Sequence, residues 1–236
     1  MAVSSIALAY RRSALMTATK VTVKPPSEEV LKARDNFQDF CKAMGKAPAK
    51  HMLEWHTELC TGNDSECLLG VAGPNTSILA PRGSAKSTVL GLFAAWMIGR
   101  HAAAKQMLRI LYIAYMVDIS RAKSATIKGI LTSKIYREIF PMVRLSKIKR
   151  SDEYWSIDYE FAGIDTAGEE AFTIACGGLK GAITSKRSQL VLIDDPIKSA
   201  ASINNPDIRR EMEQTWSNVI APTMFQGARA ICLGTR

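Results

Sequence analysis

The sequence predicts an α/β fold in which helices flank both faces of a mainly parallel sheet. From Ser77 onward, short aliphatic runs of strand length alternate with longer segments whose apolar residues recur at helical spacing. Strands that alternate with crossover helices form parallel sheets with both faces covered. A length of 236 residues, 47% of them hydrophobic, is enough for one domain with a substantial core.

The segment 28–75 is expected to be a helical lead-in to this domain. Apolar residues recur at helical spacing over 28–44, where Ser27 is a suitable N-cap. A second helix is expected over 50–60, after a proline. The lead-in then passes through a turn-rich stretch into the sheet.

The core domain, 76–236, is expected to contain the alternating elements. Strands are predicted at 77–80, 109–115, 189–193 and 228–233. Helices are predicted at 86–100, 119–131 with a second helix able to follow to 140, and 206–219. The segments 154–161 and 171–175 are typical of an antiparallel pair.

The composition narrows the class of partner. A formal net charge of +9 favours a polyanion, nucleic acid first. Residues 1–27 supply +4 of it without any acidic residue, which predicts a basic flexible tail, although transit peptides have a similar composition. The five cysteines form no C-x-x-C pair, which favours reduced thiols. The longest apolar run, 89–98, is about half the roughly 20 residues of a membrane span, so no membrane partner is expected.

The segment 80–88, APRGSAKST, is typical of a phosphate-binding loop. The usual pattern is G-x-x-x-x-G-K-[ST], and here Ala80 and Ala85 replace both glycines. Backbone N–H groups of such a loop hold phosphates, Lys86 would reach the β- and γ-phosphates of ATP, and Ser87 would bind Mg²⁺. Glycine is usual because the backbone can require a positive φ, so the alanines imply either an allowed backbone or some strain. The expected nucleotide-binding residues of the loop are Ala80, Pro81, Arg82, Gly83, Ser84, Ala85, Lys86, Ser87 and Thr88.

The segment 190–196, LVLIDDP, is an aliphatic strand that ends in two carboxylates. Asp194 is expected to bind Mg²⁺, and Asp195 to orient or activate the attacking water. The alternative is a strand followed by an ordinary polar turn. Because carboxyl ends of parallel strands meet at one edge of a sheet, both acids are expected beside the phosphate loop. The two motifs together predict a P-loop NTPase of the ASCE type.

A third motif, AICLGTR at 230–236, is an apolar strand that ends in Gly-Thr. The hydroxyl of Thr235 would sense the γ-phosphate and transmit hydrolysis to a moving part. A simple turn at the end of a strand is the alternative.

Several segments, in order, resemble the large terminase subunits of tailed bacteriophages, the ATPases that pump DNA into procapsids. The segment APRGSAKST resembles the family's variant phosphate loop, and RILYIAYMVDISRAKSATIKGIL resembles the strand and helix that follow it. The segment GGLKGAITSKRSQLVLIDDP resembles the family's small-residue loop and acidic strand, and NVIAPTMFQGARAICLGTR resembles its coupling region. The resemblance covers roughly residues 48–236.

The resemblance implies roles for three further residues. His51 falls near the adenine-contacting segment, where glutamine is common, although His51 or Trp55 could instead pack a helix. Arg82 would stabilise transition-state charge within its own subunit. Arg187, seven residues before Asp194, would reach the ATP of a neighbouring subunit, with a solvated surface arginine as the alternative.

The function implied is that of an ATPase motor domain, which hydrolyses ATP with Mg²⁺ to move double-stranded DNA into a procapsid. The implied partners are a portal protein and a small terminase subunit, in the host bacterial cytoplasm. A homo-oligomeric ring is expected on assembly and a monomer in isolation. Family members carry a C-terminal nuclease domain, and no nuclease activity is expected of this chain, which ends at Arg236.

Contacts with DNA are expected to be made mainly to phosphates, because a packaging motor must accept any sequence. The candidates are Arg144, Lys147, Lys149 and Arg150, with a solvated loop as the alternative. Two other functions stay open: a helicase-like DNA translocase of another system, and a catalytically weak module that docks onto a portal or small terminase subunit.

Overall fold

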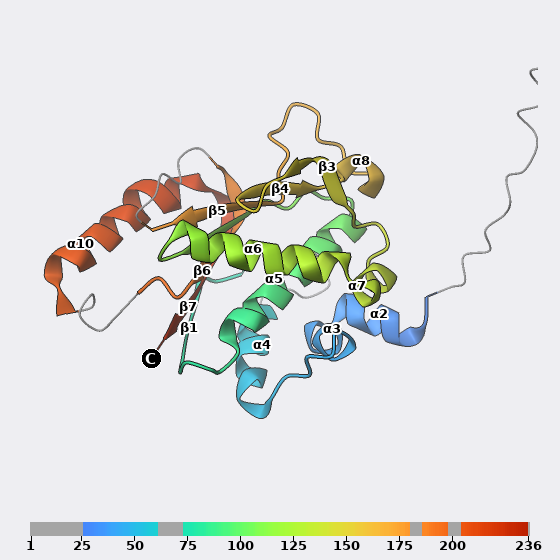
Figure 1. The fold of residues 1–236 in the computed structure, drawn as a ribbon, viewed down its shortest axis with the longest axis horizontal. Helices are drawn as coiled ribbons and strands as arrows, with labels where there is room; N and C mark the ends of the chain where they lie inside the picture. Colours follow the sequence, from blue (N-terminus) through green and yellow to red (C-terminus); the bar gives the residue numbers. More distant parts are fainter. Residues whose placement is uncertain (1–25, 61–72, 180–185, 198–203, 236) are drawn as a thin grey trace, which may run out of the picture.

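The computed structural model describes residues 26–60, 73–179, 186–197 and 204–235. They form a seven-stranded sheet in the order β1-β7-β6-β2-β5-β4-β3, with helices on both faces (Figure 1). The predicted α/β class is therefore confirmed. The strands are β1 (Thr76–Ala80), β2 (Ile110–Ala114), β3 (Leu145–Arg150), β4 (Tyr154–Ile157), β5 (Ile174–Gly178), β6 (Ser188–Asp194) and β7 (Met224–Thr235).

The helices match the predicted positions closely, apart from the differences described below. The α-helices are α2 (Glu28–Asp35), α3 (Phe37–Ala43), α4 (Leu53–Cys60), α5 (Lys86–Ala103), α6 (Val117–Thr132), α7 (Lys134–Ile139), α8 (Tyr159–Ala162) and α10 (Pro206–Thr215). Short helical turns are η1 (Lys50–Met52), η2 (Trp216–Ile220) and η3 (Ala221–Thr223).

Five neighbouring strands, β1, β7, β6, β2 and β5, are parallel. Their carboxyl ends therefore meet at one edge of the sheet. Ala80 pairs in register with Thr235, and Asp194 pairs with Leu233. The three sequence motifs thus end together at this carboxyl edge.

Strand β7 separates the strand of the phosphate loop from the strand of the acidic motif. An additional strand in this place is what the ASCE type denotes, so this part of the fold prediction is also confirmed. Neighbouring strands lie about 4.8 Å apart, which puts the ends of β1 and β6 roughly 10 Å apart. The end of β7, with Thr235, lies between them.

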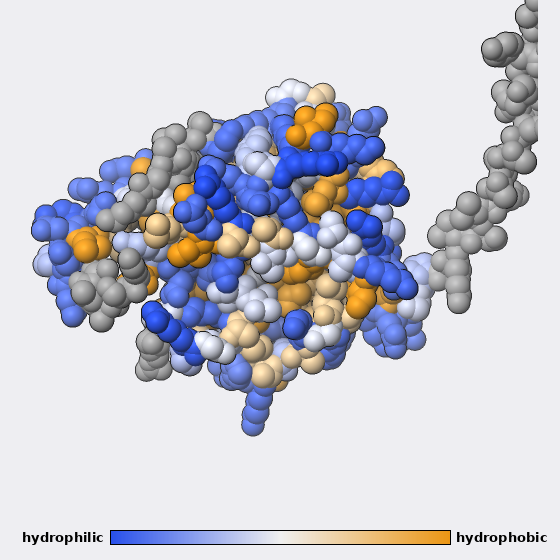
Figure 2. All heavy atoms as spheres, in the orientation of Figure 1, coloured by the Kyte–Doolittle hydropathy of each residue, from blue (hydrophilic) through white to orange (hydrophobic). Residues whose placement is uncertain are grey.

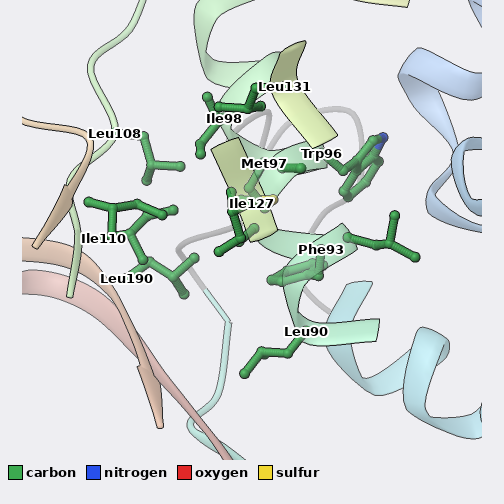
Figure 3. Close-up of a cluster of buried hydrophobic side chains, with 14 of the residues drawn as sticks. Leu90, Phe93, Trp96, Met97, Ile98, Leu108, Ile110, Ile127, Leu131 and Leu190 are labelled. Atoms are coloured by element: carbon green, nitrogen blue, oxygen red, sulfur yellow. The ribbon is translucent and has the colours of Figure 1, made fainter. Parts of the chain in front are cut away.

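The larger core lies between the sheet and α5. Figure 3 shows Leu90, Phe93 and Trp96 of α5 in one buried cluster with Ile127 and Leu131 of α6. The strand residues Ile110 and Leu190 close this cluster from the sheet. The longest apolar run of the sequence is thus a buried helix, and within the described residues no helix is both long and apolar enough to cross a membrane.

A smaller core covers the opposite face of the sheet. Ile220 of η2 packs there with Ile113 of β2 and with Val191 and Ile193 of β6. A helix was predicted over 206–219, but the α-helix ends at Thr215 and continues as one turn of π-helix. This turn carries Ile220, which is buried on the sheet.

The lead-in differs from the prediction at Asn36. A single helix was expected over 28–44, yet the structure has two helices, α2 and α3, that meet at this residue. Asn36 has an extended backbone, and its side-chain oxygen accepts a hydrogen bond from the backbone N–H of Asp39 over 3.1 Å. An asparagine side chain that caps the next helix competes with continuation of the previous one. The predicted N-cap of the first helix, Ser27, is confirmed.

Arg229 of β7 joins the lead-in to the sheet. Its guanidinium is fully buried and donates to the carbonyl oxygens of Glu58, Leu59 and Pro74 and to the hydroxyl of Thr76. These contacts attach the end of α4 to the start of β1. The strand that carries the phosphate loop is therefore held from its amino end.

The antiparallel pair predicted from 154–161 and 171–175 is present as β4 and β5, although β5 begins at Ile174, three residues later than predicted, and ends at Gly178. Its first segment is shorter than expected, because α8 begins at Tyr159 and Asp158 caps it. Strand β3 was not predicted as a strand. It is the edge strand beyond β4, and its Ile148 is 91% exposed. Hydrophilic residues cover most of the face that carries α6, with hydrophobic residues in scattered positions (Figure 2).

Candidate nucleotide-binding site

The phosphate loop follows β1 and opens directly into α5. Gly83 has φ +79° and Ala85 has φ +60°, so the backbone enters the left-handed region twice. Ala85 is also the N-cap of α5 and makes no side-chain cap, which leaves the first N–H groups of α5 without such a partner. A helix N-terminus of this kind is suited to bind a phosphate.

Only one of the two alanines at the usual glycine positions is strained. Ala80 is a buried residue of β1 and has no positive φ. Ala85 adopts a left-handed backbone, which costs an alanine roughly 1–2 kcal/mol. The sequence left both outcomes open, and the structure places the strain at Ala85 alone.

The rest of the loop is open to solvent. Pro81, Arg82 and Gly83 are exposed, as is Thr88 in the first turn of α5. The hydroxyl of Ser84 donates to the carbonyl oxygen of Pro81 over 2.7 Å, which closes the loop as a turn. The Arg82 side chain therefore belongs to the exposed part of the loop.

Lys86 is buried and contacts the two other motifs. Its Nζ donates a hydrogen bond to Thr235 Oγ1 over 2.7 Å and lies 3.8 Å from Asp195 Oδ2. Thr235 Oγ1 lies 2.7 Å from Asp195 Oδ1 and 2.8 Å from Asp195 Oδ2, to which it donates. The Thr235 hydroxyl thus accepts from the lysine and donates to the carboxylate.

Asp194 is almost fully buried, with 2% of its surface exposed. Its Oδ1 accepts from Ser87 Oγ over 2.9 Å, and its Oδ2 accepts from the hydroxyl of Tyr112 over 3.1 Å. Burial, together with the Asp194 carboxylate, raises the pKa of Tyr112 well above its usual value, so the phenol keeps its proton. Two hydroxyls therefore hold this carboxylate in place.

Asp195 has a different environment from its neighbour. Its side chain is 38% exposed, and its backbone has φ +51°. The backbone N–H of Asp195 donates to the carbonyl oxygen of Leu233 over 2.8 Å. The left-handed backbone turns the Asp195 side chain out of the strand towards Thr235, and aspartate tolerates this conformation better than most residues. The two acids thus have separate partners.

Two predicted residues, His51 and Arg187, lie outside this cluster. His51 is exposed, and its ring packs edge-on against Trp55 at 5.4 Å, as the packing alternative expects. Its contact with adenine stays a prediction. Arg187 immediately precedes β6, at the amino edge of the sheet, and β6 spans roughly 20 Å from there to Asp194. Arg187 is therefore remote from the nucleotide site of its own chain.

Tyr112 is the site residue that the sequence did not identify. It lies in the middle of β2, within a wholly buried strand, and reads as one more core aromatic. The sequence feature that could have indicated a role for Tyr112 is its place in β2, the strand that pairs with the acidic strand β6. Which hydroxyl would reach Asp194 depends on side-chain packing beneath α5.

The candidate DNA contacts lie on or next to β3, and most already have partners in the chain. The Arg144 guanidinium lies 3.6 Å from the centre of the Phe161 ring. Lys149 donates to the carbonyl oxygen of Ala171, and Arg150 donates to that of Ser146. The cluster is thus part of an edge strand and not a solvated loop, and its role with DNA stays a prediction.

The described residues contain no group of three or more His, Cys, Asp or Glu side chains placed to hold a metal. Mg²⁺ does not require such a group, because it commonly binds through one or two carboxylates, waters and substrate phosphates. The oxygen atoms of Ser87 and Asp194 are the donors that this cation prefers, and they lie 2.9 Å apart. The residues present therefore fit a magnesium–nucleotide site.

The solved structures that are similar to this chain include two from bacteriophages. One is the N-terminal domain of the DNA packaging ATPase from bacteriophage phi29, with 14% identity and a TM-score of 0.41, covering 68% of this chain and 72% of that one. The other is the large terminase ATPase domain of Thermus phage P74-26, with 15% identity and a TM-score of 0.43, covering 83% of this chain and 67% of that one. No protein-family model matches the sequence, and no curated protein matches it.

Proposed function

We propose that this chain is the ATPase motor domain of a viral DNA-packaging terminase, hydrolysing ATP to move double-stranded DNA into a procapsid. The observation that carries the ATPase part is the meeting of three distant motifs at one sheet edge. Lys86, Thr235 and Asp195 are linked there by hydrogen bonds, beside the Ser87–Asp194 pair. The packaging part rests on the resemblance of four successive segments to terminase large subunits.

ATP would bind with its phosphates in the loop 80–88. The N–H groups at the start of α5 and the Lys86 ammonium supply positive charge for the β- and γ-phosphates. Arg82 is exposed in the same loop and would add a second positive charge from this subunit. His51 is retained as the proposed adenine contact.

Ser87 and Asp194 would hold Mg²⁺. The ion, when bound, neutralises charge that develops on the phosphate oxygens. The hydrogen bonds from Ser87 and Tyr112 keep the Asp194 carboxylate in one orientation. Asp194 is therefore suited to bind the metal ion, and because it is buried it is less suited than Asp195 to contact the attacking water.

Asp195 would orient the attacking water. Its carboxylate is the exposed member of the acid pair, so water can reach it. It would accept the proton of this water as the oxygen attacks the γ-phosphorus, and the bond from that phosphorus to ADP would break. Thr235 already donates to Asp195 and thus fixes its orientation.

The contacts of Lys86 supply a means of coupling. The ammonium has three N–H donors, one of which bonds to Thr235. On our proposal it would turn towards the γ-phosphate, which would lengthen and weaken that bond. Binding of ATP would therefore release Thr235 and Asp195 from the lysine. We propose that this exchange is how the end of β7 senses the nucleotide.

Arg187 is proposed to act on the ATP of a neighbouring subunit in a homo-oligomeric ring. Its place at the amino edge, remote from its own loop, is compatible with action between subunits. The remaining partners proposed are double-stranded DNA, a portal protein, a small terminase subunit and the procapsid, in the host bacterial cytoplasm.

The function is tested by phosphate release from Mg²⁺–ATP, with and without linear duplex DNA. Lys86→Ala should abolish hydrolysis, while the matched control Lys134→Ala, an exposed lysine of α7, should keep it. Hydrolysis that is lost with Lys86→Ala and stimulated by DNA in the unmodified chain supports a DNA-dependent motor. Equal turnover in Lys86→Ala and the unmodified chain would refute the site.

A further inference from the structure

A cavity of about 520 Å³ opens at the amino edge of the sheet, on the opposite side from the phosphate loop. Arg109 immediately precedes β2, Arg187 precedes β6, and Thr223 precedes β7, and all three line it. Asn218 of η2 adds an exposed amide at its rim. The amino ends of three neighbouring strands therefore bring two arginines and a threonine together, and Glu170 also lines the cavity.

Arg109 is an unusual lining residue because only 5% of its surface is exposed. Its backbone N–H donates to Gln189, and its Nη2 forms an ion pair with Glu169. Its Nε is buried and has no hydrogen-bond partner among the described residues. Such an unsatisfied donor on a buried charged group is costly, which makes a missing acceptor the natural explanation.

Arg187 also lines this cavity, and its guanidinium lies near the same aromatic ring as that of Arg109. Its guanidinium carbon lies 6.0 Å from the centre of the Phe225 ring, and that of Arg109 lies 5.3 Å from the same ring. Phe225 thus draws two like charges together. Within the described part of the chain, no carboxylate pairs with Arg187. The nearby Glu170, which also lines the cavity, is already paired with Lys186.

We propose that this cavity is a second phosphate-binding site, which takes a phosphate group of a nucleic acid backbone or of a nucleotide. Arginine suits this ligand because its planar guanidinium can donate two parallel hydrogen bonds to phosphate oxygens. A phosphate between Arg109 and Arg187 would neutralise their repulsion. The hydroxyl of Ser188, next to Arg187, is a second buried group without a partner among the described residues. The site lies at the opposite edge of the sheet from the phosphate loop of the same chain, and it shares Arg187 with the contact proposed above for the ATP of a neighbouring subunit.

The site is tested on the full chain carrying Lys86→Ala, so that binding at the phosphate loop does not interfere. In a sample labelled with ¹⁵N-arginine, titration with inorganic phosphate should shift the Arg109 Nε–H signal saturably. Calorimetry should give an affinity that Arg187→Ala weakens by roughly tenfold or more. The matched control is Arg209→Ala, an exposed arginine of α10, which should bind as the parent does.

A second variant keeps the charge and the fold. Arg109→Lys retains a cation beside Glu169 but loses the guanidinium fork, so phosphate affinity should again fall. Unchanged affinity in both Arg187→Ala and Arg109→Lys, or no shift of the Arg109 signal, would overturn the proposal. Because Lys86 is already replaced, a positive result stands even if the unmodified chain proves to have no ATPase activity.

Two further titrations separate the sources of the phosphate. A short DNA duplex whose affinity falls in Arg187→Ala identifies a phosphodiester ligand. If instead Arg187→Ala lowers the affinity for ATP, measured in the Lys86→Ala background, the ligand is a nucleotide. Either result supports the site, and failure of inorganic phosphate, duplex and ATP alike to bind there would contradict it.

Discussion

Lys86 Nζ donates to Thr235 Oγ1 over 2.7 Å, although 149 positions separate the two residues in the sequence. This bond joins the phosphate loop at the end of β1 to the end of β7, the next strand of the sheet. The Thr235 hydroxyl in turn donates to the Asp195 carboxylate, so Asp195 is linked to Lys86 through Thr235. A change in the position of Lys86 would therefore alter the hydrogen bonds of both Thr235 and Asp195.

We predict that Thr235→Val lowers turnover at saturating ATP by roughly tenfold, the effect of losing one hydrogen bond near the reacting groups. Valine keeps the branched shape but cannot link Lys86 to Asp195. Thr235→Ser keeps the hydroxyl and should retain most of the activity. The measurement is kcat with and without duplex DNA. Equal kcat in the valine and serine variants would show that the hydroxyl does not matter.

We predict that Tyr112→Phe raises the Mg²⁺ concentration needed for nucleotide binding by roughly tenfold, as is usual when the partner of a metal-binding group is removed. The change leaves Asp194 with one hydroxyl partner, Ser87. Binding of a fluorescent ATP analogue over a range of Mg²⁺ concentrations measures the effect. The matched control is Tyr136→Phe, which removes a buried hydroxyl bonded to the carbonyl oxygen of Ala95, away from the site. A similar Mg²⁺ requirement in both variants would argue against a role for Tyr112.

We predict that Ala85→Gly stabilises the fold by about 1 kcal/mol, because glycine adopts the left-handed backbone of this position without strain. Ala80→Gly is the matched control, since it lies in a strand without a positive φ. There glycine should destabilise by roughly 1–2 kcal/mol, through backbone entropy and the lost burial of the alanine methyl group. Urea unfolding measures both free energies. Changes of the same sign in the two variants would contradict the assignment of the strain to Ala85.

We predict that the free energy of unfolding falls as the pH is lowered from 6.5 towards 4. His101 of α5 is buried, and burial lowers its pKa to about 4. The unfolded chain, with an ordinary histidine pKa near 6.5, binds the proton more readily, so stability present above that pH is lost below it. The loss amounts to about 3 kcal/mol from His101, and His56, whose pKa burial also lowers, adds to it.

Urea unfolding at a series of pH values tests this dependence. His101→Gln should flatten the decline between pH 6.5 and 4, and the exposed His51→Gln should leave it as it is. A slope unchanged by His101→Gln would show that another group is responsible.

Much of the fold was predictable, because hydrophobic periodicity and chain order determine it. The buried strands β2 and β6 and the apolar helix α5 carry strong patterns and lie where expected. The convergence of Lys86, Asp194 and Asp195 followed from the rule that parallel strands end at one edge. Strand β3 was missed because its sequence, LSKIKR, is charged and its isoleucine faces solvent.

The parts that could not be predicted depend on side-chain contacts between distant segments. The helix break at Asn36 is decided by a cap to Asp39 that competes with helix continuation. The role of Tyr112 depends on its depth under α5, and that of Arg229 on four acceptors from two segments. The sequence permits either a strained or an unstrained backbone at Ala85, and only the backbone angles decide between the two.

The central claim is that the two adjacent acids divide the work, Asp194 in metal binding and Asp195 in hydrolysis. Asp195→Asn tests it most directly, because asparagine accepts the left-handed backbone and the hydrogen bond from Thr235 but cannot take a proton from water. The measurement is ATP affinity in Mg²⁺ together with turnover in one sample. We predict an affinity close to that of the unmodified chain and turnover lower by roughly a hundredfold to ten-thousandfold. Turnover retained in Asp195→Asn, or affinity lost together with turnover, would contradict the account.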